Sequence, residues 1–178
     1  MSETKPVNNF LNQIFNLENK VAVVIGGGGY LCSEMARGFA RAGCAVAVLD
    51  FRLEKAQDVK ANLKAEGFDK VMALAIDVTN KEQHVAALEA ILARFGQLDI
   101  LVNGAGTNGP TPFLNLSLDE WYSILDSQLT GTFLGCQVLV AIWSIAKRGP
   151  SSIFHLLLPV PRFLRPSLIQ SPKQASLT

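Results

Sequence analysis

The sequence predicts an α/β fold, in which a parallel sheet carries helices on both faces. Two observations predict this fold. Short, wholly apolar runs alternate with longer segments that mix apolar and polar residues, and each apolar run leads into glycine or a polar residue. Wholly apolar runs are typical of buried parallel strands, because helices cover both faces of such a sheet. Repeated strand–helix alternation then implies right-handed crossovers and a doubly wound sheet.

The elements follow one another at regular intervals. Strands are predicted over 21–25, 45–49, 71–76 and 98–102, and a fifth, weakened by its leucines, over 152–158. The first two helices are predicted over 31–42 and 53–66, and a glycine ends each of them. Two capping boxes begin the remaining helices. They are Thr79-Asn80-Lys81-Glu82, before a helix to Phe95, and Ser117-Leu118-Asp119-Glu120, before a long helix to about Lys147.

Length and composition narrow the class of protein. The 178 residues suffice for one domain with a hydrophobic core, and a hydrophobic content of 49% excludes wholesale disorder. The net charge of +1 gives no sign of nucleic-acid binding. The three cysteines are widely spaced, form no metal-binding motif and suit a reducing compartment. Residues 1–10 lack the apolar run of a secretory signal. We therefore predict a cytoplasmic protein without a metal site.

One uncharged stretch is long enough to cross a membrane. It runs from Ser127 to Ala146 and contains 20 residues without a charge. Polar side chains interrupt it, and it continues a helix that begins with charged, capped residues. We interpret it as a helix buried in a core or an interface, and we expect no membrane partner.

Residues suited to nucleotide binding collect where the predicted strands end. Gly26-Gly27-Gly28-Gly29 joins a strand to a helix N-terminus, where free N–H groups and the helix dipole hold a phosphate. Asp50 ends the second strand, 24 residues after Gly26. A carboxylate there accepts both ribose hydroxyls of an adenosine and repels a 2′-phosphate. The pattern favours NAD over NADP, although Arg52 could accommodate the extra phosphate.

The next two strand ends add weaker signals. Asp77 could accept from an adenine amino group, or it could be a loop aspartate before the next helix, whose cap Thr79 supplies better. Asn103-Gly104-Ala105-Gly106 would run its backbone beside adenine and ribose. His84, on a polar helix face, and His155 have no carboxylate or cysteine at useful spacing, so we interpret both as structural or solvated.

Together these strings resemble the short-chain dehydrogenase/reductase family. The matching pieces, in the family's order and spacing within about residues 17–137, are 24–29, 48–50, 76–79, 98–106 and 129–133. The resemblance implies a Rossmann-type sheet with strand order 3-2-1-4-5, incomplete at its C-terminal side, and a nicotinamide dinucleotide as cofactor. It assigns cofactor binding to Gly26, Gly28, Gly29, Tyr30, Leu31, Asp50, Asp77, Val78, Asn103, Gly104, Ala105 and Gly106.

The resemblance also implies an activity and a partner. The activity is NAD-dependent oxidation of a secondary alcohol, or the reverse reduction of a ketone. The segment 107–112 is similar to members that act on sugar acids or polyols, such as gluconate or mannonate/fructuronate oxidoreductases. In the family, the helix matching 118–147 lies at a dimer interface, which implies an oligomer formed through that helix.

Three departures from the family affect the expected activity. Tyr30 and Cys32 stand where the family's turn usually has glycine. Gln128 replaces the asparagine of the catalytic tetrad, although its amide could still hold a water. The catalytic Tyr-x-x-x-Lys is missing, because Ile169 stands four residues before Lys173, and leucines occupy the place of the catalytic serine around 157–158. We therefore expect this chain as written to be inactive.

The C-terminal tail differs in composition from the rest. All 15 acidic residues lie at or before Asp126, and most of the prolines fall in 150–172. We predict an N-terminal extension over 1–16, an NAD-binding domain over 17–149, and an atypical Pro-rich tail over 150–178 in place of the catalytic segment. Two interpretations of the tail stay open, an irregular surface segment and a lost or frame-shifted C-terminal third. The alternative function is dinucleotide or partner binding without catalysis.

Overall fold

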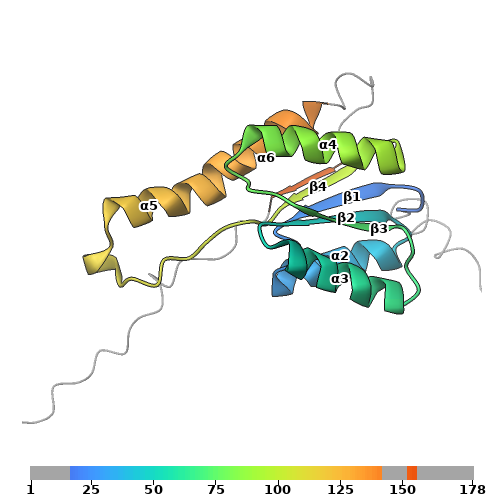
Figure 1. Ribbon diagram of the computed structural model, residues 1–178, viewed down its shortest axis with the longest axis horizontal. Coiled ribbons are helices and arrows are strands. Elements are labelled where there is room, and N and C mark those ends of the chain that lie inside the picture. Colours follow the sequence, from blue (N-terminus) through green and yellow to red (C-terminus); the bar gives the residue numbers. More distant parts are fainter. Residues whose placement is uncertain (1–16, 142–151, 156–178) are drawn as a thin grey trace, which may run out of the picture.

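The computed structural model describes residues 17–141 and 152–155. Its strands form one parallel sheet in the order β3-β2-β1-β4-β5 (Figure 1). The strands are β1 (Val21–Ile25), β2 (Ala45–Asp50), β3 (Val71–Ala75), β4 (Ile100–Asn103) and β5 (Ser152–His155). The predicted α/β class and strand order are confirmed. The predicted extension over 1–16 lies outside the described residues, as do residues 156–178 of the predicted tail.

Helices cover both faces of the sheet, as expected for a doubly wound fold (Figure 1). α2 (Tyr30–Arg41) and α3 (Leu53–Ala65) lie on one face, and α4 (Lys81–Phe95) and α6 (Gly131–Leu139) lie on the other. A short 3-10 turn, η1 (Phe113–Asn115), comes before α5 (Leu118–Leu125), which extends beyond the sheet.

The central strand β1 explains why the predicted strands are wholly apolar. All five of its residues are buried, and Val24 lies between Val48 of β2 and Val102 of β4. Alternate residues of β1 belong to the two separate cores, one on each face of the sheet. Burial of a valine side chain stabilises a fold by about 1.5–3 kcal/mol, so these runs supply much of the driving force for folding.

The start of α4 differs from the prediction. Asn80 is the N-cap, and its Oδ1 accepts a hydrogen bond of 3.0 Å from the backbone N–H of Gln83. The prediction that Thr79 caps this helix is wrong. The Thr79 hydroxyl instead donates to Asp77 Oδ1 at 2.7 Å, so the helix begins one residue later than a cap at Thr79 would allow. The cap predicted at Ser117 is confirmed, since its Oγ accepts from the N–H of Glu120 at 3.2 Å.

The predicted continuous helix over 118–147 is divided. A π-helical turn, η2 (Asp126–Thr130), separates α5 from α6, and residues 142–147 lie outside the described part. Such turns are mostly single-turn interruptions within α-helices, so the capped helix predicted from Ser117 onward is present but is not regularly wound throughout. Among the described residues, no helix combines the length and the apolar character that a membrane span needs.

His84 is buried, so the prediction that it lies on a polar face of its helix is wrong. It shares the inner face of α4 with Ala87 and Ile91, and its Nε2 lies 2.9 Å from the carbonyl oxygen of Val78. Burial lowers the pKa of His84, because the charged imidazolium would lose its hydration. A neutral ring that donates from Nε2 to Val78 fits this position.

Candidate functional site

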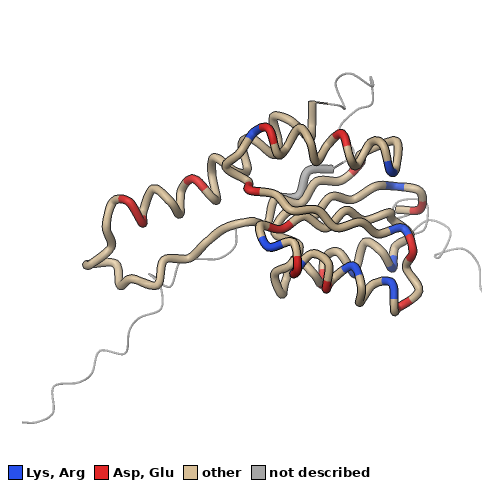
Figure 2. The backbone as a smooth tube through the Cα atoms, viewed as in Figure 1, with Lys and Arg blue, Asp and Glu red and all other residues tan. Residues whose placement is uncertain are grey.

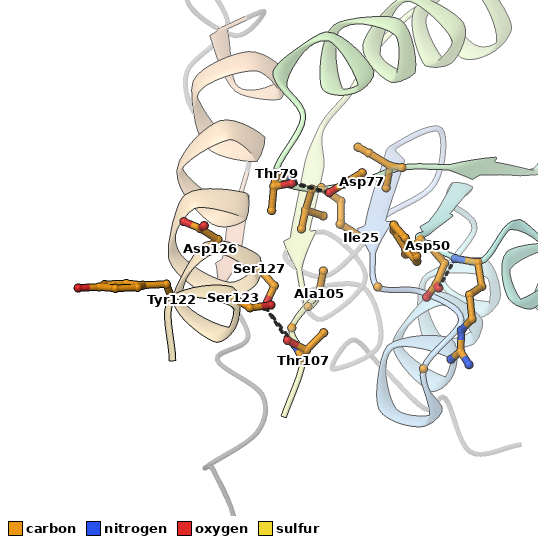
Figure 3. A pocket seen from close by; sticks show the side chains of 18 of the residues that line it. Ile25, Asp50, Asp77, Thr79, Ala105, Thr107, Tyr122, Ser123, Asp126 and Ser127 are labelled. Carbon is orange, nitrogen blue, oxygen red and sulfur yellow. Dashed lines mark hydrogen bonds between the residues drawn. The ribbon is translucent and has the colours of Figure 1, made fainter. Parts of the chain in front are cut away.

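A cleft of about 810 Å³ lies where the strands end, within the size range of small-molecule sites. Its lining comes from four strand ends and from the helical segment α5–η2. Figure 3 shows Asp50 on one side of this cleft and Asp126 and Ser127 on the other, with Ala105 between them. The strand ends contribute Gly26, Gly29, Asp50, Asp77, Val78, Gly104, Ala105 and Gly106 of the predicted set, together with Phe51, Arg52, Thr79 and Thr107.

The glycine turn after β1 requires residues without a side chain. Gly26 has a φ of +75°, and a Cβ there would lie 2.7 Å from the backbone N of Ala105. A Cβ at Gly28 would lie 2.8 Å from Asp50 Oδ2. Gly29 caps α2 without any side-chain hydrogen bond, so the N–H groups of its first turn keep their capacity to bind an anion. The backbone around this turn therefore fits a phosphate group.

Two predicted residues of this turn point elsewhere. Tyr30 is 88% exposed and Leu31 is 45% exposed, and neither lines the cleft. Cys32, in the first turn of α2, is buried against Gly104. The bulkier side chains at 30 and 32 are thus accommodated outside the cleft, on the surface and in the core respectively.

Asp50 connects the glycine turn to the end of β2. Its Oδ2 accepts from the N–H of Gly28 at 3.0 Å, and its Oδ1 accepts from the N–H of Arg52 at 3.0 Å. These two bonds fix the carboxylate at the edge of the cleft, although the residue is only 9% exposed. Each carboxylate oxygen can accept a further hydrogen bond from a ligand hydroxyl.

The loop after β3 holds its aspartate in a fixed orientation. Asp77 Oδ1 accepts from both the N–H and the hydroxyl of Thr79, at 2.9 and 2.7 Å. The N–H of Asp77 donates to Gln83 Oε1 at 2.7 Å. Val78, which lies between Asp77 and Thr79 in the sequence, also lines the cleft. This loop presents a carboxylate and an apolar side chain side by side, an arrangement suited to a planar ring with an amino group.

The segment after β4 is attached to the helix across the cleft. The Thr107 N–H donates to Ser127 Oγ at 3.2 Å, and the Thr107 and Ser127 hydroxyls lie 3.1 Å apart (Figure 3). The Gln128 side chain donates to the Thr107 carbonyl at 3.2 Å and does not line the cleft. The sequence interpretation missed Thr107 and Ser127. The sequence did offer a signal, since Thr107 directly follows the glycine segment and Ser127 directly precedes Gln128.

Asn103 is placed differently from its glycine neighbours. It is 4% exposed, lies outside the cleft, and its Nδ2 donates to Cys136 Sγ at 3.5 Å. Its Oδ1 is buried without a hydrogen-bond partner among the described residues. The side chain therefore contacts α6 beneath the cleft, while Gly104, Ala105 and Gly106 present backbone to the cleft.

Charges around the fold are mixed, and α5 and η2 carry acidic ones. Figure 2 shows Lys and Arg interspersed with Asp and Glu over the helices that flank the sheet. Asp119 and Asp126 line the cleft from α5–η2. The described residues include no group of three or more His, Cys, Asp or Glu that could hold a metal ion. The positions expected for the catalytic serine, tyrosine and lysine, around 157–158 and 169–173, lie outside the described residues.

Comparison with known proteins places the described fold among oxidoreductases. The model of the short chain dehydrogenase family matches residues 20–153. An uncharacterized oxidoreductase, UxuB of Bacillus subtilis, is 38% identical over 138 residues, which cover 69% of this chain and 49% of that protein. D-threitol dehydrogenase of Mycolicibacterium smegmatis is 37% identical over 126 residues, or 70% and 48% of the two chains.

Solved structures share this fold. The crystal structure of gox2181 superposes with a TM-score of 0.74 at 29% identity, over 80% of this chain and 55% of that one. The chain spans about half the length of the curated relatives that it matches.

Proposed function

Because the chain belongs to the short-chain dehydrogenase family, we propose that its cleft binds a nicotinamide dinucleotide and prefers NAD to NADP. The observation that carries the preference is Asp50, whose carboxylate is held at the edge of the cleft beside the glycine turn. The glycine turn, with no space for a Cβ at 26 or 28, supports a pyrophosphate next to α2. The loop at Asp77 and Val78 supports the adenine.

Electrostatics supports the preference for NAD. A ribose 2′-hydroxyl can donate to Asp50, whereas a 2′-phosphate would add negative charge next to it. Two like charges about 4 Å apart repel by about 4 kcal/mol at an effective dielectric constant of about 20, and less at a partly solvated edge. Arg52 lines the same cleft and acts in the opposite direction, since a guanidinium attracts a phosphate.

Titration of the purified chain with NAD and with NADP tests this proposal. We expect NAD to bind at least about tenfold more tightly, and we expect Asp50→Asn to reduce the difference, because the amide keeps an acceptor oxygen but not the charge. Arg52→Ala is the matched control and should weaken only NADP binding. Tighter binding of NADP by the unaltered chain, or no change in Asp50→Asn, would contradict the proposed role of Asp50.

For the chemistry, we propose an oxidoreductase of secondary alcohols and ketones, of the class that acts on sugar acids or polyols. A relative's name, D-threitol dehydrogenase, supports the polyol class. The nicotinamide, when bound, supplies hydride transfer. The family's tyrosine exchanges the proton, and the two tyrosines of these 178 residues, Tyr30 and Tyr122, lie on α2 and α5 rather than at the catalytic position.

These 178 residues should therefore bind NAD without turning over a polyol. General acid–base catalysis contributes about 10²–10⁴-fold to rate, so its loss leaves little activity. The assay is formation of reduced nicotinamide from NAD with a panel of polyols and sugar acids. Reading the coding DNA from about codon 135 in all three frames then tests whether the C-terminal third is lost or frame-shifted. Turnover by the purified chain would overturn the proposed inactivity and leave the binding proposal standing.

Exposed apolar side chains on α5, η2 and α6 support the proposed oligomer. Leu118, Leu129 and Phe133 are each more than half exposed. Light scattering of the purified chain measures the oligomer, and Leu129→Lys together with Phe133→Lys should shift it toward the monomer. A cytoplasmic location is proposed as well, and it is supported by three cysteines that all remain free thiols in the structure.

A further inference from the structure

Two residues 72 positions apart in the sequence meet beside the cleft. Cys32, in the first turn of α2, is 3% exposed, and its Sγ lies 3.9 Å from the carbonyl oxygen of Gly104. Gly104 lines the cleft, whereas Cys32 does not. The thiol therefore reaches the nucleotide site only through the backbone of Gly104.

Position 104 is closed to side chains by Cys32. A Cβ at Gly104 would overlap Cys32 Sγ, at well under the 3.0 Å that real Cβ contacts respect. Gly104 is not among the glycines with a positive φ, so its backbone conformation does not by itself require glycine. The next obstacle, the carbonyl oxygen of Ile25 at 3.2 Å, is tight but requires only a small shift. The sulfur atom is thus the main obstacle to a side chain at residue 104.

The other side of the same segment is closed by the glycine turn. The N–H of Gly104 donates to the carbonyl of Ile25 at 3.0 Å, and Gly26 approaches so closely that a Cβ there would lie 2.7 Å from Ala105 N. The segment that begins at Gly104 is therefore held between Gly26 and Cys32. A shift of either neighbour would move backbone that faces the cleft.

We infer that Cys32 and Gly104 form a matched pair, in which the thiol occupies the space of the missing side chain and positions the backbone of Gly104–Gly106 against the glycine turn. Cys32 is then a positioning residue of the cleft. The effect on ligand affinity rests on the proposed nucleotide function, whereas the steric match does not depend on it.

The protonation state of the thiol agrees with this role. Burial, together with the nearby charge of Asp50, raises the pKa of Cys32 above its ordinary value. The sulfur therefore keeps its proton at neutral pH and can donate weakly to the Gly104 carbonyl.

A double-mutant cycle on the full chain tests the pair. Gly104→Ala should destabilise the fold and weaken NAD binding, because the new methyl group meets the sulfur. Cys32→Ala removes the sulfur and leaves a Cβ 3.9 Å from the new methyl group, an ordinary contact distance. The double variant should therefore regain stability and affinity, with a coupling of about tenfold in the unfolding equilibrium constant. Urea unfolding without nucleotide and titration with NAD are the two measurements.

Two controls separate the steric match from general stability. Cys32→Ser keeps an atom at the place of the sulfur and should not rescue Gly104→Ala. Cys32→Ala should not rescue Gly26→Ala, whose methyl group meets Ala105 N and strains a φ of +75°. If Gly104→Ala fails to fold, recovery of folding in the double variant is the readout.

Each outcome bears on the inference. Additive effects, equal rescue by serine, or a double variant that also fails to fold would overturn the matched pair. Recovered stability in a chain that binds no NAD at all would uphold the pair and refute the proposed nucleotide function instead.

Discussion

Asp99 offers the sharpest test of how the sheet is held together. The residue lies directly before β4, is 3% exposed, and its Oδ2 accepts from the N–H of Val21 at 2.9 Å and from Gln97 Nε2 at 2.8 Å. Its Oδ1 accepts from Lys20 Nζ at 3.1 Å. One buried carboxylate therefore connects the start of β1 to the start of β4.

The magnitude of Asp99→Ala follows from these bonds. The N–H of Val21, at 2% exposure, loses its acceptor, and an unsatisfied buried donor costs about 1–3 kcal/mol. The pair with Lys20 adds less than about 1 kcal/mol, because the lysine side chain is 43% exposed and screened by solvent. We expect a total loss of about 1–4 kcal/mol from the free energy of unfolding, a large part of the 5–15 kcal/mol typical of a domain.

Urea unfolding followed by circular dichroism measures the change. Lys20→Met is the matched control, because it removes the exposed partner and leaves the carboxylate bonded to Val21. Its expected loss is below about 1 kcal/mol. Asp99→Asn should fall between the two, since an amide oxygen still accepts from Val21. Equal losses for Asp99→Ala and Lys20→Met would refute the argument, because they would show that the buried acceptor contributes nothing beyond its ion pair with Lys20.

Three further predictions concern pH, a helix cap and the cleft. The lowered pKa of His84 means that the imidazole binds a proton more readily in the unfolded chain than in the folded one, so stability should fall as pH drops below about 6.5. In urea unfolding, His84→Gln should remove this contribution to the dependence of stability on pH. Asn80→Ala should cost about 1 kcal/mol in the same assay and more than Thr79→Ala, or the assignment of the cap fails. Ser127→Ala removes both contacts to Thr107 and should weaken NAD binding several-fold, with a stability loss of no more than about 1.5 kcal/mol; unchanged affinity would show that this link does not position the cleft.

The sheet could be predicted from the sequence because its signals are local. Val21–Ile25 and residues 45–49 are apolar on both faces, a run that is typical of a strand covered on both sides. The ends of the strands could be predicted from these runs. Because parallel strands end at one edge of the sheet, Gly26, Asp50 and Gly104 could also be expected to line one cleft, as they do.

The errors and omissions have a common cause. Each depends on competition between neighbouring side chains, or on contacts between segments, that the spacing of residues along the sequence does not indicate. Thr79 and Asn80 are both good caps, and the choice between them depends on Asp77, which takes the threonine hydroxyl. His84 has charged neighbours in sequence but lies beneath Val78 in space. The contact of Cys32 with Gly104 joins segments that are distant in sequence, so no local pattern indicates it.

The π-helical turn η2 sets the rotation of α5 relative to α6. A π turn amounts to one extra residue inside a helix. Deleting one residue from 126–130 would restore regular winding and rotate α5 by about 100° relative to α6, since an α-helix has about 3.6 residues per turn. Ser127 would then leave Thr107, and Asp126 would leave the wall of the cleft. The chain length of this one segment, rather than the identity of its side chains, therefore determines which face of α5 borders the cleft.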